Sequence, residues 1–177
     1  GHARVHWLEV DEHARMRLDN LQTALASYPA EEVAGVTTLI GNNEVGSIQP
    51  VDEIVAMVKD AGVAVHLDAI QAFGHIPLEL GRWNADAVTL SAHKIGGPVG
   101  IGALVVSRDA ATFSPLSHGG AQQEHRSGTL DAAGASAFAR ATTEALTGLE
   151  QESKRLSELS ESLRHGLEAV DGVVARG

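Results

Sequence analysis

The sequence predicts an α/β fold with a mostly parallel sheet and helices on both faces. Short apolar runs rich in β-branched residues recur along the chain, and an amphipathic pattern typical of a helix separates two of them. These runs alternate little between apolar and polar residues, which is typical of strands that are covered on both faces. A strand, a helix and a further strand in succession indicate the parallel crossover unit.

In the first part of the chain we expect two strands and one helix. Residues 5–10 alternate weakly between apolar and polar side chains and predict a strand. Residues 18–27 predict a helix, because leucines recur on one face and Asp19 suits the N-cap position. Residues 33–40 form an apolar run rich in β-branched side chains, which predicts the second strand.

The middle of the chain continues the same pattern. Residues 51–61 predict a helix, because apolar side chains recur at intervals of three and four and Gly62 follows. Further strands are predicted at residues 63–67 and 85–91. An apolar run at residues 100–106 comes after a connection too short for a parallel crossover, so we expect it to pair antiparallel.

The last part of the chain predicts two helices after a polar loop at residues 114–130. The first is rich in alanine and covers residues 131–147, and the second covers residues 149–170. The second carries a narrow stripe of leucines with charged residues around it. Such a stripe requires another surface against which it can pack.

The composition is that of one domain and narrows the class of partner. A chain of 177 residues that is 44% hydrophobic can bury one core. Its net charge of −10 disfavours nucleic acid, whose phosphates require a basic surface. No apolar run approaches the roughly 18 residues that span a bilayer, so we expect no membrane partner. The absence of cysteine excludes disulfides, thiolate metal sites and a cysteine nucleophile within these residues, which fits the cytoplasmic location that we expect.

Polar side chains follow the predicted parallel strands where each of them ends. The carboxyl ends of such strands meet at one edge of the sheet, where ligands bind in open α/β folds. Gln71 comes three residues after Asp68 and shares its side if the chain turns helically there. The candidate residues at this edge are Asn43, Asp68, Gln71, Ser91, His93 and Lys94.

Pyridoxal phosphate is the cofactor whose chemistry requires this set. It needs a lysine for its Schiff base and a carboxylate that keeps its ring nitrogen protonated. Lys94 and Asp68 meet these two requirements in type and predicted position. The remaining candidates suit the phenolate oxygen of the cofactor (Asn43 or Gln71) and its phosphate (Ser91 and His93).

Other interpretations of these residues are open at this point. Asp68 could cap a helix, and Asn43 could serve only as a turn residue. The glycines after Lys94 match neither a P-loop nor a dinucleotide fingerprint, which disfavours a nucleotide-binding domain. His118 and His125 lie in a glycine-rich loop and are too weak a pattern for a metal site, so we expect no metal.

Four ordered blocks of sequence stand out: Asn-Asn-Glu-Val-Gly at residues 42–46, His-Leu-Asp-Ala-Ile-Gln at 66–71, Ser-Ala-His-Lys-Ile-Gly-Gly-Pro-Val-Gly-Ile-Gly-Ala-Leu at 91–104 and Arg-Ser-Gly-Thr at 126–129. Together these blocks resemble the cysteine desulfurases, which are class V aminotransferases among the fold-type I pyridoxal phosphate enzymes. Their order and spacing agree with the family. The loop at residues 119–125 departs from its common pattern.

The resemblance implies a homodimeric enzyme that takes sulfur from L-cysteine and leaves alanine. Lys94 would hold pyridoxal phosphate as a Schiff base and move the α-proton of the substrate, and Asp68 would pair with the ring nitrogen. Thr129 would reach the phosphate of the cofactor in the neighbouring subunit. A sulfur-acceptor protein is a further expected partner, with iron–sulfur cluster assembly and tRNA thiolation both open as destinations.

The resemblance covers only the middle of the family's chain, so we expect an incomplete fold. Residues 1–147 would form the central part of the cofactor-binding large domain, and residues 148–177 a long helix leading to a missing small domain. Because the sulfur-accepting cysteine is absent, the 177-residue chain alone is expected to be inactive. The alternatives are another class V enzyme (a selenocysteine lyase, an epimerase or an aminotransferase) and a non-catalytic fragment that binds no cofactor.

Overall fold

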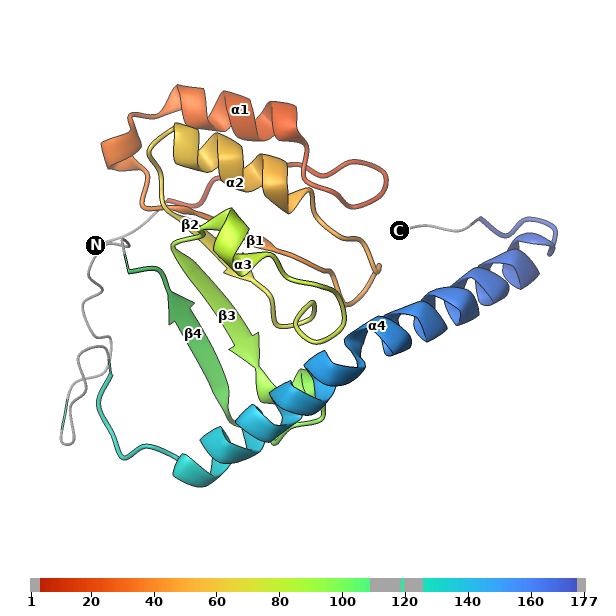
Figure 1. Ribbon diagram of the computed structural model, residues 1–177. Helices are drawn as coiled ribbons and strands as arrows, with labels where there is room; N and C mark the ends of the chain where they lie inside the picture. Colours follow the sequence, from red (N-terminus) through yellow and green to blue (C-terminus); the bar gives the residue numbers. More distant parts are fainter. Residues whose placement is uncertain (1–3, 109–118, 120–125, 175–177) are drawn as a thin grey trace.

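The sheet of this protein is mostly parallel, as the sequence predicts. The computed structural model describes residues 4–108, 119 and 126–174. Its sheet has the strand order β1-β2-β3-β4 (Figure 1). Strands β1 (Val36–Leu39), β2 (Val65–Asp68) and β3 (Ala87–Ser91) are parallel, and β4 (Gly102–Val106) pairs antiparallel with β3. The predicted direction of the last strand is therefore confirmed.

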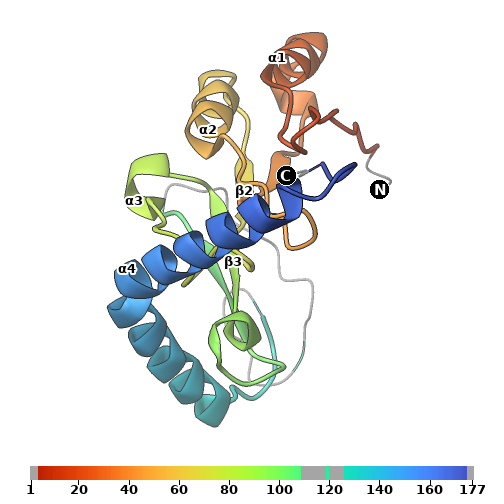
Figure 2. The same cartoon turned by 90° about the vertical axis from the view of Figure 1, so that its right-hand side faces the viewer.

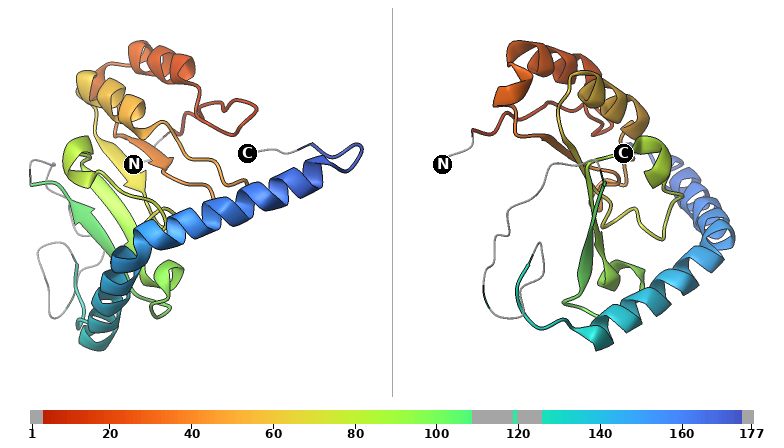
Figure 3. Two further views of the ribbon diagram at one scale, coloured as in Figure 1. Left: turned by 45° about the vertical axis from the view of Figure 1, so that its right-hand side comes forward. Right: turned by 60° about the vertical axis from the view of Figure 1, so that its left-hand side comes forward.

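The helices that the structure describes cover one face of the sheet. They are α1 (Leu18–Ser27), α2 (Val51–Asp60), the short α3 (Leu80–Trp83) and α4 (Ala132–Glu168), with 3-10 turns η1 (Ala30–Glu32) and η2 (Ala92–Ile95). In a view close to the sheet edge, α2, α3 and α4 lie on one side of β3 and β4 (Figure 3). On the other face, Leu39 and Leu104 are exposed. The α/β class is confirmed, and in the described part of the chain its helices lie on the first face.

The hydrophobic core lies between this face of the sheet and helices α1 and α2. Apolar residues at intervals of three and four place one side of α2 against the sheet, as its sequence predicts. Leu21 of α1 is also fully buried in this core. The α2 and β2 residues of the core are Val51, Ile54, Val55, Val58, Val65 and Leu67.

Two predictions for the beginning of the chain are wrong. Residues 5–10 do not form a strand and contribute only an isolated antiparallel bridge between Val10 and Met16. Asp19 does not cap α1, whose N-cap position is Arg17. The Asp19 carboxylate instead accepts a hydrogen bond from the Arg17 guanidinium at 2.6 Å.

The two helices predicted at residues 131–147 and 149–170 are one helix, α4, of 37 residues. A glycine inside a helix costs only about 1 kcal/mol, so Gly148 does not end it. The helix bends part-way along its length (Figure 2). Its first turn is capped by the Asp131 carboxylate, which accepts a hydrogen bond from the Gly134 amide at 2.8 Å. Within the described residues, no helix has the length and apolar character needed to cross a membrane.

A half-buried ion pair ties α2 to the sheet. Lys59 of α2 donates to both oxygens of Asp86 at 2.9 and 3.0 Å, and the Val65 amide donates to the same carboxylate at 2.8 Å. Burial opposes ionisation of Asp86, but the hydrogen bonds from Lys59 and Val65 outweigh it and lower the pKa of the carboxyl below its ordinary value of 3.8.

We expect Asp86→Asn to lower the free energy of unfolding by about 1–3 kcal/mol at neutral pH, because it removes the charge that Lys59 pairs with. A depressed carboxyl pKa stabilises the fold above the unfolded pKa of 3.8, and this contribution is lost as the pH falls through the lower folded value. Urea unfolding of the parent chain and of Asp86→Asn should therefore give free energies of unfolding that differ at neutral pH and become equal in acid.

The control for this experiment is Asp19→Asn, which removes an exposed carboxylate paired with Arg17. It should have no comparable effect at neutral pH, because exposed pairs contribute little. The role given to this ion pair would be contradicted if the free energies of unfolding of Asp86→Asn and the parent chain differed by the same amount at every pH.

Candidate functional site

The parallel strands bring the candidate residues to one edge of the sheet. In the register of the sheet, Leu39 of β1 lies opposite Asp68 of β2, and Asp68 lies opposite Thr89 of β3. The three strands therefore end at the same edge, and the connections that carry Asn43, Gln71 and Lys94 leave from it. The topology thus places the connections that carry Asn43, Asp68, Gln71, Ser91, His93 and Lys94 at one edge, and their roles in a site stay a prediction.

Asn43 lies in the turn that follows β1. The neighbouring Asn42 holds this turn, because its side-chain oxygen accepts hydrogen bonds from the amides of Glu44 at 2.8 Å and Val45 at 3.1 Å. Gly41 and Ile48 close the turn with an isolated bridge. Asn43 is exposed within it. The turn geometry therefore does not depend on the Asn43 side chain, which leaves that carboxamide available to a ligand.

Asp68 and Gln71 belong to one short helical connection after β2. One oxygen of the half-buried Asp68 carboxylate accepts from the Ile70 amide at 2.9 Å, which fixes the orientation of the carboxylate. The Phe73 amide donates to the Ala69 carbonyl at 2.8 Å, so the chain turns helically here, as predicted. Such a turn meets the condition under which the sequence predicts that Gln71 shares the side of Asp68.

The Gln71 side chain has an unfilled hydrogen-bonding position. Its amide oxygen is buried, and it has no hydrogen-bond partner among the residues that the structure describes. Leaving such an atom unpaired costs about 1–3 kcal/mol. A half-turn of the carboxamide presents its N–H donors at the same place, so the position suits a ligand that carries either an acceptor or a donor.

Ser91, His93 and Lys94 follow β3 in the turn η2. The Ser91 hydroxyl lies 2.7 Å from Nδ1 of His93. When Nδ1 accepts from this hydroxyl, the proton of the neutral ring is on Nε2, where it can be donated to an anion. Lys94 is half-buried, and its amine has no ion-pair or hydrogen-bond partner within the described part of the chain. Such an amine is available to react with a carbonyl group.

Thr129 comes from a separate segment, the residues that precede α4, and it is exposed. Its expected role concerns a second subunit and stays a prediction. His118 and His125 lie outside the described residues. Among the residues that are described, no group of three or more histidines, aspartates or glutamates is arranged to hold a metal ion.

His66 is a polar residue near the site to which the sequence patterns assign no role. It lies on β2 two residues before Asp68 and therefore on the same face of the sheet. Its Nδ1 lies 2.7 Å from the Thr37 hydroxyl, and its Nε2 lies 3.2 Å from the Thr89 hydroxyl. His66 therefore ties three parallel strands together below the candidate site. His66 belongs to the sequence block at residues 66–71, but no sequence pattern predicts its contacts with two threonines.

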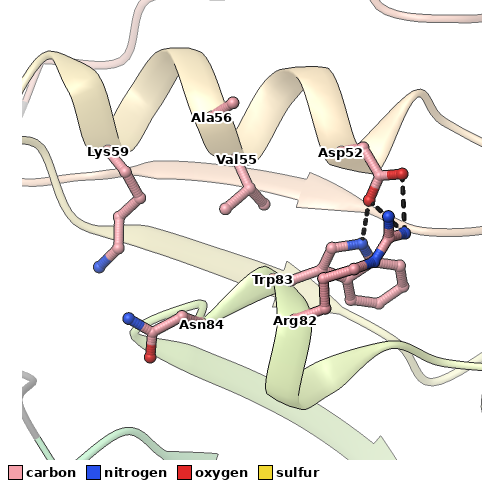
Figure 4. A pocket seen from close by; sticks show the side chains of 7 residues that line it. All are labelled: Asp52, Val55, Ala56, Lys59, Arg82, Trp83 and Asn84. Atoms are coloured by element: carbon pink, nitrogen blue, oxygen red, sulfur yellow. Dashed lines mark hydrogen bonds and ion pairs between the residues drawn. The ribbon is translucent and has the colours of Figure 1, made fainter.

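A separate hollow of about 420 Å³ lies between α2 and α3, away from the candidate residues (Figure 4). The Asp52 carboxylate accepts from the Arg82 guanidinium at 2.8 Å and from the Trp83 indole N–H at 2.5 Å. The guanidinium in this hollow is therefore already neutralised by a carboxylate of the chain. We interpret these contacts as a link between the two helices.

Comparison with known proteins shows the family of this chain. The model of the aminotransferase class V family matches residues 1–177. The chain belongs to the class V aminotransferase family. Among its relatives in this family is an IscS-like cysteine desulfurase of Mycobacterium tuberculosis, which is 41% identical over 177 residues. That match covers 99% of this chain and 44% of the relative.

Solved structures show the same fold. A NifS-like protein superposes with a TM-score of 0.85 at 32% identity, over 98% of this chain and 47% of the other. The structure of SspA in complex with cysteine matches with a TM-score of 0.70 at 30% identity, over 78% of this chain and 39% of the other. The chain therefore spans less than half the length of these relatives.

Proposed function

We propose that this chain forms the cofactor-binding part of a pyridoxal phosphate-dependent cysteine desulfurase. The observation that supports the proposal is the common sheet edge of three groups, an amine and a buried amide oxygen without partners among the described residues and an oriented carboxylate, from Lys94, Gln71 and Asp68. The desulfurase names of the relatives support the reaction, and the complex of SspA with cysteine supports the substrate.

The residues present fit pyridoxal phosphate. Lys94 would hold the cofactor through its amine and would also take the proton from the α-carbon of the substrate. Asp68 would hold the proton on the ring nitrogen, and Gln71 would fill its open position with the phenolate oxygen. When bound, the cofactor supplies an electron sink for the bonds around the α-carbon of the substrate.

The remaining candidates surround these three. Ser91 and His93 would bind the phosphate, since the pair can present an N–H donor to an anion. Asn43 would lie near the substrate. In a homodimer, Thr129 would reach the cofactor of the partner. In this proposal residues 1–147 belong to the large domain, and the rest of α4 leads toward a small domain.

Sulfur transfer requires one group that these residues do not supply. The sulfur atom of cysteine must be attacked by a thiolate, and the 177 residues contain no cysteine. The nucleophile must therefore come from a residue outside this sequence, and a sulfur-acceptor protein would take the sulfur from there. We expect the 177-residue chain to bind the cofactor but not to release alanine from cysteine.

The first test locates the amine that reacts with the cofactor. The chain contains only three lysines, Lys59, Lys94 and Lys154. After substoichiometric pyridoxal phosphate and borohydride reduction, peptide mapping should find the label at Lys94 far more often than at the other two. A visible absorption band of the bound cofactor should disappear in Lys94→Ala and persist in the matched control Lys154→Ala. Equal labelling of the three lysines would contradict the proposal.

The second test concerns the phosphate position. Ser91→Ala removes the hydroxyl that bonds Nδ1 of His93 and thereby keeps the Nε2–H donor available to the phosphate. The affinity for pyridoxal phosphate should fall about tenfold, the effect of losing that one hydrogen bond from His93 to a charged group. The affinity for pyridoxal, which lacks the phosphate, should change little. Both dissociation constants can be measured by absorption titration. If Ser91→Ala lowers the affinities for pyridoxal phosphate and pyridoxal by the same factor, Ser91 does not act on the phosphate.

A further inference from the structure

We infer that His75 is a positioning residue for Lys94, at the end of a three-residue clamp formed by Phe73, Gly74 and His75. The clamp holds the turn η2, which carries Lys94, against the connection that carries Asp68 and Gln71. The consequence for Lys94 chemistry rests on the function proposed above, but the clamp itself is defined by contacts of the described residues.

The hydrogen bond from His75 is the most direct contact with the lysine. Nε2 of His75 lies 3.0 Å from the main-chain carbonyl oxygen of Lys94. A carbonyl oxygen can only accept, so Nε2 carries the proton and donates. A four-residue 3-10 turn has poor internal hydrogen-bond geometry, and it gains from an external donor at one of its carbonyls.

Gly74 allows three elements to meet at this place. Its φ is +76°, which favours glycine, and a Cβ atom at this position would lie 2.6 Å from Cγ2 of Ile95 in η2. The same atom would lie 3.2 Å from the Cβ atom of Ala145 in α4. The lack of a side chain therefore lets η2 and α4 close on the turn from two directions.

Phe73 completes the clamp with apolar contacts. It is buried in a small cluster with Ala92 of η2 and Phe138 of α4. The rings of Phe73 and Phe138 pack edge to face, with centroids 6.4 Å apart and an angle of 89° between their planes. Three successive residues thus contact η2 through an apolar ring, a close approach and a hydrogen bond.

The clamp connects the groups whose relative positions the proposed chemistry requires to be fixed. The connection that begins at Asp68 also carries Gln71 and ends at His75, so one short segment fixes the carboxylate, the amide and the turn bearing the lysine. The lysine side chain is long and flexible, and the reach of its amine depends on where its main chain is held. Small displacements of a reacting group lower rates strongly.

Groups of α4 also face His75 and belong to its surroundings. The pKa of Glu152 is lowered by its hydrogen bond to Arg155 and, to a smaller degree, by the charge of His75. His75, Ser153 and Leu156 line one hollow between the clamp and α4. The exposed imidazole of His75 therefore contacts η2 through the Lys94 carbonyl and borders α4 at this hollow. Its substitution should leave the Glu152–Arg155 pair intact, because these two side chains bond to each other.

Hydrogen exchange of the 177-residue chain tests the clamp without any cofactor. In His75→Leu, the amides of residues 92–97 should exchange about fivefold faster, because the turn loses one hydrogen bond. His75→Gln offers an N–H at a similar reach and should restore slow exchange. His165→Leu, at the end of α4, is the matched control and should leave these amides unchanged. Unchanged exchange in His75→Leu would overturn the clamp.

Trapping of the cofactor links the clamp to the chemistry. With pyridoxal phosphate and borohydride, the share of label at Lys94 relative to Lys154 should fall severalfold in His75→Leu and recover in His75→Gln. If the parent chain labels Lys94 selectively and His75→Leu does so equally, the positioning role is wrong and the proposed function stands. If the parent chain shows no preference for Lys94, the proposed function fails, and the exchange experiment alone decides the clamp.

Discussion

The parallel pairing of β1, β2 and β3 is the constraint on which the site depends. Because the three strands run in one direction, the connections after them all begin at the same edge of the sheet. Residues of three connections that are distant in sequence become neighbours there, from Asn43 to Lys94. The antiparallel β4 begins at this edge and closes the turn that carries Lys94.

The central strand β2 serves the core and the site at the same time. Val65 and Leu67 point into the core with α2, whereas His66 and Asp68 point to the opposite face. Side chains alternate along a strand, so a shift of one residue would exchange these two sets. The burial of two apolar side chains therefore fixes the direction of the Asp68 carboxylate, and the ring of His66 ties the neighbouring strands to it.

The candidate side chains are oriented mainly by contacts within the connections that follow the strands. The Asn42 side chain orders the turn after β1, and the Ile70 amide orients Asp68. The clamp at residues 73–75 places η2. These devices position an amine, a carboxylate and an amide, which is what a bound cofactor requires from a protein. They do not provide a thiolate, so binding and sulfur transfer depend on different segments of polypeptide in the proposed enzyme.

The sequence by itself determined the mostly parallel class of the sheet, the antiparallel direction of β4 and helices α1 and α2, because local periodicity and the lengths of the connections control them. The order of the strands came from the tertiary structure. Other features depended on contacts between distant residues. The segment at residues 5–10 has a strand pattern but forms only an isolated bridge with Met16, and α4 continues through Gly148. The bond from His75 to Lys94 joins positions 19 residues apart, and no periodicity encodes it. Only the tertiary structure decided which nearby polar side chains hold the site and which are left for a ligand.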